Sequence, residues 1–269
     1  MLEEIYGIKH EAFGHAQDLL KPAGREATGQ YLVESVSFVQ QALFSPSKVQ
    51  MVFTLPEEQP TFRDLCKERE VLLYRVRQGL MQKLVGTSYD TTVTAIAEEE
   101  KRFLTLEDIL AQPQGLFLAG EDIQDPRNVG VLIRTAESAG CSALLLSVTS
   151  AEPYSRAAVR STTGSILRLP LLLCPDLPLS MARLREAGVS VIASSAKADD
   201  LAYQADLGRR PLVLTVGNET SGITDALRAQ ATDFVKLPMA PNGASSLNVT
   251  VAAGVLLYEA VRQGLHRKL

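Results

Sequence analysis

Short apolar runs recur through the second half of the chain, with amphipathic segments between them. The runs are Leu116–Ala119, Ala143–Leu146, Val189–Ala193 and Leu212–Val216. Runs that are apolar almost throughout, rather than alternating with polar residues, are typical of strands buried on both faces of a sheet. Because these runs alternate with helix-like segments, the pattern predicts an α/β fold, a parallel sheet covered by helices on both faces.

The first hundred residues show a different mixture, which predicts a second, smaller α/β domain. Runs rich in β-branched and apolar residues favour strands, and apolar positions at helical spacing favour helices. The strands are expected at Gln50–Thr54, Val71–Val76 and Thr91–Ala97, and the helices at Gln30–Phe44 and Gln78–Val85.

The charge cluster that ends Ala95–Arg102 separates these two regions. We therefore place a domain boundary near residue 105, with one domain over 1–105 and the other over 106–269. The chain of 269 residues is long enough for this division, since one domain usually takes about 100–200 residues.

The last apolar stretch, Ser246–Arg262, has the spacing of one long helix. One of its faces is apolar, and we expect that face to pack against the sheet. The face consists of Leu247, Val251, Gly254, Val255, Tyr258 and Val261.

Composition excludes several classes of protein. No apolar run approaches the roughly 18–20 residues of a membrane helix, and the N-terminus lacks the pattern of a signal peptide. We therefore expect a cytoplasmic protein with no membrane partner. The three cysteines are far apart and show no ligand spacing, so neither a disulfide framework nor a metal site is predicted. A net charge of −4 argues against a protein that coats nucleic acid through its overall field.

Positive charge is nevertheless concentrated locally. Residues 1–105 hold 12 Lys and Arg against 15 Asp and Glu, but residues 126–170 hold five arginines against two acids. The planar fork of arginine suits phosphate recognition, although such charges more often belong to a solvated helix face. Among these arginines, the candidates for contact with a nucleic-acid phosphate are Arg127, Arg156 and Arg160.

Three clusters could carry chemistry, and the first is Asp125–Gly140. It follows a predicted strand and opens a helix, with Asn128 placed as a helix N-cap. Arg134 lies among apolar neighbours, where a lone arginine needs a partner.

The second cluster, Leu214–Thr224, is a strand that ends in a glycine turn containing Glu219. Its Gly217 and Gly222 have the spacing of a phosphate-binding P-loop, but Ile223 stands where the phosphate-binding lysine belongs. No dinucleotide fingerprint is present either. Its position alone indicates a ligand site, because open α/β sheets bind ligands beyond the carboxyl ends of their strands.

The third cluster, Leu237–Val249, runs directly into the closing helix. Ser246 and Asn248 flank Leu247 at the start of that helix, where helix capping competes with a functional role. Taken singly, each of the three clusters is more often structural than catalytic.

Together, and in this order, the clusters resemble the signature motifs of the SpoU or TrmH branch of the SPOUT RNA methyltransferases. The motifs are carried by Asn128, Gly130 and Arg134, then by Gly217, Glu219 and Gly222, and finally by Pro238–Val249. The resemblance covers about 110–265 strongly. It extends more weakly over the first domain, which is similar to the small ribosomal-protein-like RNA-binding domain of many members. One departure is that six residues separate Met239 from Ser246 where five are expected, which indicates a reshaped cofactor loop.

The resemblance implies a C-terminal parallel-sheet domain with a deep trefoil knot, an exception to the usual absence of knots. It also implies a homodimer with its active site at the subunit interface, and S-adenosyl-L-methionine as cofactor. The cofactor positions carried over are Gly217, Leu237, Met239, Ser246 and Leu247.

The activity implied is methylation of a ribose 2′-hydroxyl in structured RNA, with ribosomal RNA favoured over transfer RNA. The resemblance makes Arg134 essential, with Asn128, Glu219 and Asn248 as further catalytic candidates. An arginine stays protonated in proteins, so its role is open between proton acceptor and stabiliser of the developing alkoxide.

Three alternatives stay open. They are a transfer-RNA 2′-O-methyltransferase, a non-catalytic RNA-binding protein on the same fold, and a small-molecule enzyme on an ordinary doubly wound sheet. The intact second and third motifs argue against the binding protein, while the first domain and the arginine cluster argue against the small-molecule enzyme.

Overall fold

The computed structural model describes residues 2–86, 91–98, 105–244 and 246–266. Packing divides the chain into two compact units. The first unit comprises Met1–Lys101 and Pro153–Arg168, and the second comprises Arg102–Glu152 and Leu169–Leu269. A segment from the middle of the C-terminal sequence therefore packs with the N-terminal residues. None of the described helices is long and apolar enough to cross a membrane.

The first unit is built on a mixed five-stranded sheet of order β1-β4-β3-β5-β2. Strand β3 is parallel to β4 and antiparallel to β5, and β5 is antiparallel to β2. The strands are β1 (Leu2–Glu4), β2 (Gln30–Glu34), β3 (Val49–Thr54), β4 (Leu72–Arg75) and β5 (Val93–Glu98). The helices are α1 (Glu11–Asp18), α2 (Pro22–Thr28), α3 (Val36–Phe44), α4 (Gln59–Glu68), α5 (Gln78–Val85) and α8 (Arg156–Thr162).

The helix predicted over Gln30–Phe44 is wrong in its first third. Residues Gln30–Glu34 form β2, which pairs with β5 from Gln30 opposite Glu98 to Glu34 opposite Thr94. Ser35 then turns the chain with a φ of 87°, and its hydroxyl caps α3. The pairing partner lies some sixty residues away in sequence, so long-range strand pairing overrode the local helical spacing.

The second unit contains a six-stranded, wholly parallel sheet of order β11-β9-β10-β6-β7-β8. Its strands are β6 (Leu116–Gly120), β7 (Ala143–Ser147), β8 (Leu171–Cys174), β9 (Ser190–Ser194), β10 (Leu212–Val216) and β11 (Asp233–Val235). Its helices are α6 (Leu106–Leu110), α7 (Pro126–Ser138), α9 (Leu177–Glu186), α10 (Asp225–Arg228) and α11 (Val249–His266). The predicted α/β class and parallel sheet are confirmed.

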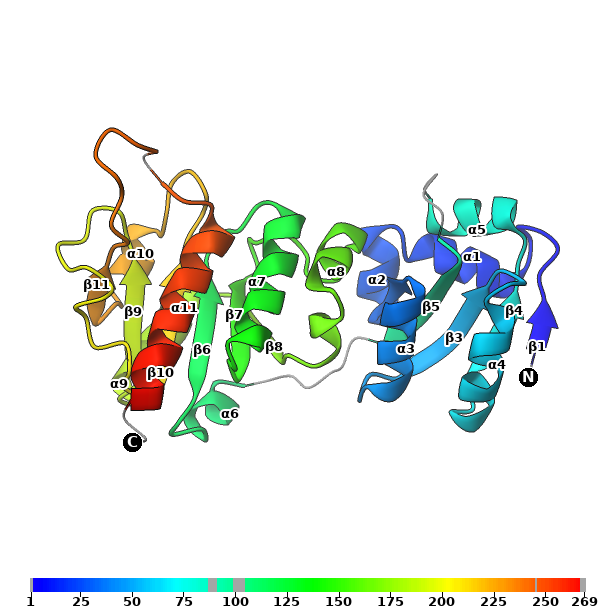
Figure 1. Cartoon of the computed structure of the whole chain (residues 1–269), viewed down its shortest axis with the longest axis horizontal. Helices are drawn as coiled ribbons and strands as arrows, with labels where there is room; N and C mark the ends of the chain where they lie inside the picture. Colours follow the sequence, from blue (N-terminus) through cyan, green and yellow to red (C-terminus); the bar gives the residue numbers. More distant parts are fainter. Residues whose placement is uncertain (1, 87–90, 99–104, 245, 267–269) are drawn as a thin grey trace. The chain divides into compact units, whose positions relative to one another are not determined.

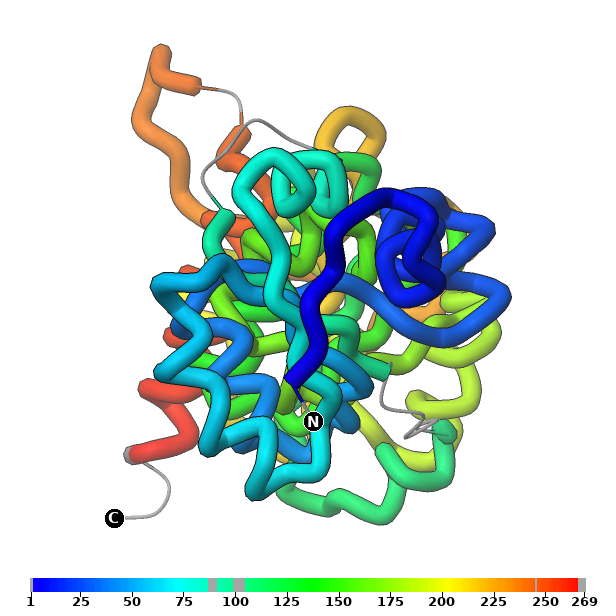
Figure 2. The backbone as a smooth tube through the Cα atoms, turned by 90° about the vertical axis from the view of Figure 1, so that its right-hand side faces the viewer, coloured from blue at the N-terminus to red at the C-terminus, as the bar shows by residue number. Residues whose placement is uncertain are grey.

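Helices cover both faces of this sheet. On one face, α7 and α11 lie side by side (Figure 1). On the other, α9 packs Met181 and Leu184 onto inward side chains such as Phe117, Val191 and Val213. In Figures 1 and 2 the segment between β11 and α11, coloured orange, projects from the body of its unit. That segment contains the extra residue noted in the sequence.

Helix α11 buries a different face from the predicted one. Its buried residues are Val249, Ala253, Leu256, Leu257, Glu259 and Ala260. Within the predicted stripe, Leu247, Val251 and Tyr258 are exposed. The other members of the predicted stripe, Gly254, Val255 and Val261, are half-buried, and a Cβ at Gly254 would lie 3.5 Å from the Thr135 side chain of α7.

Candidate functional site

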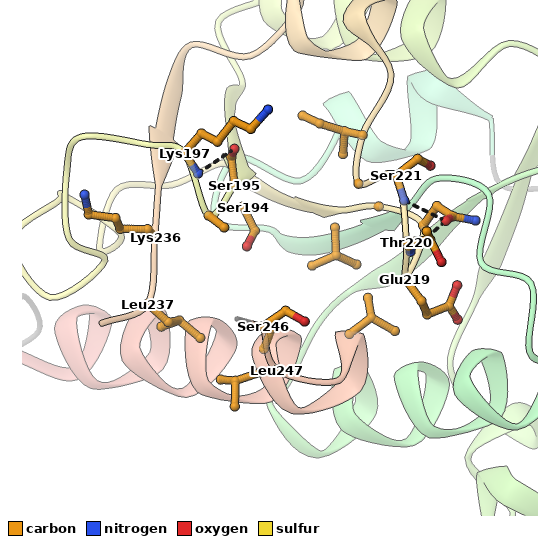
Figure 3. A pocket seen from close by; sticks show the side chains of 18 of the residues that line it. Ser194, Ser195, Lys197, Glu219, Thr220, Ser221, Lys236, Leu237, Ser246 and Leu247 are labelled. Carbon is orange, nitrogen blue, oxygen red and sulfur yellow. Dashed lines mark hydrogen bonds between the residues drawn. The ribbon is translucent and has the colours of Figure 1, made fainter. Parts of the chain in front are cut away.

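A cavity of about 370 Å³ opens at the carboxyl ends of β9, β10 and β11 (Figure 3). This is the edge at which open α/β sheets bind ligands. The segments that follow the three strands line it, together with the start of α11. All five predicted cofactor positions are among its lining residues: Gly217, Leu237, Met239, Ser246 and Leu247.

The loop after β10 is closed tightly on itself. Asn218 and Gly222 exchange two backbone hydrogen bonds of 3.1 and 2.9 Å, and Gly222 has a φ of +73°. A Cβ added at Gly217 would lie 2.3 Å from the carbonyl carbon of Gly222 and 2.4 Å from the nitrogen of Ile223. Glycine is therefore required at 217, because the backbone of Gly222 and Ile223 occupies the space that a Cβ would need.

Two contacts fasten this loop to the end of β6. The Asn218 side-chain amide donates to the carbonyl and the carboxylate of Asp122, at 2.9 and 3.0 Å. The buried carboxylate of Glu121 accepts from the backbone N–H and the hydroxyl of Thr224, at 2.7 and 2.8 Å. Because buried polar groups are costly unless they are paired, these bonds fix the loop on the neighbouring strand.

Three of the four predicted catalytic residues form one hydrogen-bonded chain at the edge of the cavity. The Asn128 amide donates to a Glu219 carboxylate oxygen at 2.7 Å. The Asn248 amide donates to the Asn128 side-chain oxygen at 3.3 Å. Asn248 also accepts from the backbone N–H of Thr250 at 2.9 Å, at the start of α11. One residue from each of the three sequence motifs thus takes part.

The expected capping role of Asn128 is wrong. The N-cap of α7 is Asp125, whose carboxylate accepts from the backbone N–H of Arg127 at 2.8 Å, and Pro126 occupies the first turn. Proline is favoured there because its missing N–H would be unpaired in any case. The Asn128 side chain is consequently available to reach Glu219.

The predicted arginines occupy three different settings. The Arg127 guanidinium contacts both carboxylate oxygens of Asp125 and holds the pKa of that carboxyl below its ordinary value. Arg134 is exposed on α7, outside the cavity, and makes no hydrogen bond or ion pair to any residue in the described ranges. Arg156 and Arg160 lie on α8 in the first unit, where both contact Glu34.

Sequence reasoning missed part of the cavity wall. Ser194 ends β9 and 195–197 follow it, while Lys236 follows β11. In Figure 3, Lys197 and Lys236 lie toward one end of the cavity and Glu219 toward the other. The end of β9 could have been found from the rule that ligands bind beyond strand ends, whereas β11 is too short to be seen as a strand. Among the described residues, no three His, Cys, Asp or Glu side chains group as metal ligands.

Comparison with known proteins agrees with this geometry. The family model described as SpoU rRNA Methylase matches residues 115–258. A protein of Synechocystis described as an uncharacterized tRNA/rRNA methyltransferase is 30% identical over 253 residues, which cover 92% of this chain and 89% of that protein. A 23S rRNA (guanosine-2′-O-)-methyltransferase of Vibrio cholerae is 36% identical over 76% of this chain and 83% of its own length.

A solved structure shares the fold over nearly the whole chain. The AdoMet-bound rRNA methyltransferase of Sinorhizobium meliloti superimposes with a TM-score of 0.85 and 26% identity, covering 97% of this chain and 98% of that one. The resemblance seen in the sequence is therefore confirmed. The chain belongs to the SpoU rRNA methylase family.

Proposed function

We propose that the protein transfers a methyl group from S-adenosyl-L-methionine to a ribose 2′-hydroxyl in RNA. The observation that carries the proposal is the junction of the three motifs, Asn248 to Asn128 to Glu219, at the edge of the cavity. Membership of the SpoU family and the AdoMet-bound relative support both the enzyme class and the cofactor.

The cavity fits this cofactor. Its volume lies within the roughly 300–1,000 Å³ of typical small-molecule sites. Apolar side chains such as Leu237 and Leu247 would hold the adenine, and polar groups line the rest of the wall. Lys236 and Glu219 supply both signs of charge to a ligand that carries a carboxylate and a sulfonium.

The cofactor supplies an activated methyl group, and the chain supplies the alignment. Methyl transfer needs the hydroxyl oxygen in line with the methyl carbon, so positioning accounts for much of the rate. Asn128 and Asn248 hold the Glu219 carboxylate at the edge of the cavity, where it would orient the ribose. Arg134 would stabilise the negative charge that develops on the hydroxyl oxygen.

Ribosomal RNA is the favoured substrate, with transfer RNA as the alternative. The Vibrio cholerae relative acts on 23S rRNA by its name, whereas the name of the Synechocystis relative covers both RNAs. The test is to incubate the purified protein with labelled S-adenosylmethionine and with rRNA or tRNA from cells that lack it. Label in a 2′-O-methylated nucleotide of rRNA is expected. Label found only in tRNA would make tRNA the substrate instead of rRNA. Label in neither RNA would contradict the proposed activity.

We expect the first unit to select the RNA and the second to bind the cofactor. Substrate RNA should therefore slow amide hydrogen exchange in 2–86 and 91–98, because contacts with RNA exclude water from that surface. The measurement is exchange on the full chain with and without RNA. The full chain is required because removing 1–105 would also strip Pro153–Arg168 of its packing partner. Slowing confined to the second unit would contradict this division.

We infer that the protein is a homodimer, with the exposed apolar stripe of α11 in the interface. Val251, Tyr258 and Leu265 are exposed and recur at the spacing of one helix face. An apolar stripe of this kind is rarely left in water, and a second copy of the chain brings a matching stripe.

Replacing Val251 by aspartate is expected to convert the dimer to a monomer, because the new charge would be buried between two copies. Light scattering measures the mass. The matched control is Leu179→Asp on α9, since Leu179 and Val251 are both 50% exposed. The control should stay dimeric. A dimeric Val251→Asp variant would place the interface elsewhere.

A further inference from the structure

Part of the connection between β7 and β8 packs in the first unit, although both strands belong to the sheet of the second unit. The two strands are parallel neighbours, with Leu144 opposite Leu171, so the chain between them must cross over. Such crossovers ordinarily pack back onto their own sheet. Here the segment Pro153–Arg168, which we call the crossover arm, belongs to the first unit, and its helix α8 packs against β2.

A buried carboxylate anchors the crossover arm. Glu34, at the end of β2, is 4% exposed. The Arg156 guanidinium contacts both of its oxygens, with Nη2 at 2.7 Å from Oε2, and Arg160 Nη1 lies 3.3 Å from the same oxygen. The Thr91 hydroxyl also donates to Glu34, at 3.3 Å. The carboxylate is therefore held by donors from the arm and by Thr91, which lies two residues before β5.

Further contacts hold both ends of the arm. The rings of Tyr154 and Tyr31 lie 5.0 Å apart, and Arg168 donates to the side-chain oxygen of Gln41 at 2.9 Å. A buried ion pair adds little net stability, because desolvation offsets the attraction between the charges. What such a pair can fix is geometry, and here it fixes where the arm lies on β2.

The residues just before the arm are bonded to the loop that supports the active site. Four hydrogen bonds join 147–151 to 122–124. The nearest to the arm runs from the backbone N–H of Ala151 to the carbonyl of Ile123, at 2.7 Å. Only Glu152 separates this bond from the arm.

The same supporting loop holds the second motif. Asp122 accepts from the side-chain amide of Asn218, and the backbone N–H of Gln124 lies 3.5 Å from a Glu219 carboxylate oxygen. A continuous series of covalent and hydrogen bonds therefore runs from Glu34 through the arm to Glu219. Chains of this kind can transmit a change in one unit to the other.

We propose that Glu34 is a positioning residue for methyl transfer. By anchoring the crossover arm to the first unit, it couples the state of that unit to the geometry of the Asn218–Gly222 loop. The inference rests on the proposed function, since it concerns the methyl-transfer site, but its first test needs no RNA.

Glu34→Gln keeps the shape and removes the charge. It should speed amide hydrogen exchange roughly tenfold in α8, as expected when a hydrogen bond to a charged group is lost, and measurably in 217–223 as well. The matched control is Glu4→Gln, which breaks the Glu4–Arg75 pair of the same unit, away from the arm. The control should leave 217–223 unchanged. Faster exchange in α8 with no change in 217–223 would overturn the coupling.

The second readout is kinetic. Glu34→Gln should lower the single-turnover methyl-transfer rate about tenfold when both RNA and cofactor are saturating. The double variant Glu34→Gln with Arg156→Gln should lose less activity than the product of the two single losses, because the two changes share the Glu34–Arg156 pair. Additive losses, or a wild-type rate for Glu34→Gln, would refute the positioning role. If Glu34→Gln does not fold, Arg156→Lys keeps the charge without the fork and takes its place in both tests. An inactive wild type would count against the proposed function, while the exchange test would still decide the coupling.

Discussion

Replacing Arg134 by alanine is expected to lower the single-turnover rate of methyl transfer by a factor on the order of 10² or more. Arg134 is exposed on α7 and makes no hydrogen bond or ion pair to a described residue of its own chain, so its guanidinium is not committed to holding the fold together. If it acts on the ribose oxygen, its contribution arises mainly in the transition state. RNA affinity should then change little, because a phosphate contact would be only one of several.

The measurement uses excess enzyme, saturating RNA and labelled S-adenosylmethionine, beside binding isotherms at two salt concentrations. Arg134→Lys should also be slow, because lysine keeps the charge but loses the planar fork. Arg127→Ala, from the same helix, removes a candidate RNA contact rather than a catalytic group, so this control should weaken RNA binding but keep the wild-type rate at saturating RNA. A wild-type rate for Arg134→Ala at saturating RNA would make Arg134 a binding residue only.

Mixing two inactive variants would show whether Arg134 serves the partner's site. In a heterodimer, the Arg134→Ala subunit keeps an intact cavity and the Gly217→Val subunit keeps an intact Arg134. If Arg134 acts across the interface, these two intact parts meet in one active site. If Arg134 acts within its own subunit, neither site is complete. In the first case, random exchange of subunits should restore about a quarter of the wild-type activity. No restoration, despite proven exchange, would mean that Arg134 acts within its own subunit.

Replacing Gly217 by valine is expected to weaken cofactor binding by a factor on the order of 10². A Cβ at this position would lie 2.3 Å from the carbonyl carbon of Gly222, so the loop after β10 must open to admit the side chain. Opening breaks the Asn218–Gly222 backbone pair and moves one wall of the cavity. The loss would therefore arise from deformation of the loop, rather than from a side chain that fills the cavity.

Calorimetry with S-adenosylmethionine measures this effect, and circular dichroism checks that the variant is folded. The matched control is Gly79→Val on α5, because nothing lies within 4 Å of a Cβ placed there. The control should bind the cofactor as the wild type does. Unchanged affinity in a folded Gly217→Val variant would mean that the cofactor site lies elsewhere.

Local pattern was sufficient to predict much of the second unit. The apolar runs that include Leu116–Ala119 and Leu212–Val216 became β6 and β10, because parallel strands buried on both faces have a composition that few other elements share. Residues of the three motifs also meet in the structure. Glu219 follows β10 and Asn128 follows β6, and these strands are neighbours in the sheet, so their carboxyl ends lie together.

The wrong predictions concern segments whose local sequence pattern fits two different local conformations. Gln30–Glu34 fits a helix by spacing and a strand by composition, and only its pairing with β5 decides between them. Both Asp125 and Asn128 can cap a helix, and Pro126 settles the start of α7 in favour of Asp125. The apolar stripe of α11 was visible in the sequence, but its direction was not, because Ala253, Leu256, Leu257 and Ala260 form a second apolar face, and that face is the buried one.

The sequence by itself determined the parallel α/β class, the family and the residues of the three motifs, because each depends on local composition and spacing. Only the tertiary structure decided that Pro153–Arg168 packs with the first unit and that Glu34 is the partner of Arg156 and Arg160. Glu34 and Arg156 are 122 residues apart, and no local signal marks either as the partner of the other. Ion pairs of this kind depend on which surfaces meet when the chain folds, and that choice belongs to the packing of the whole unit.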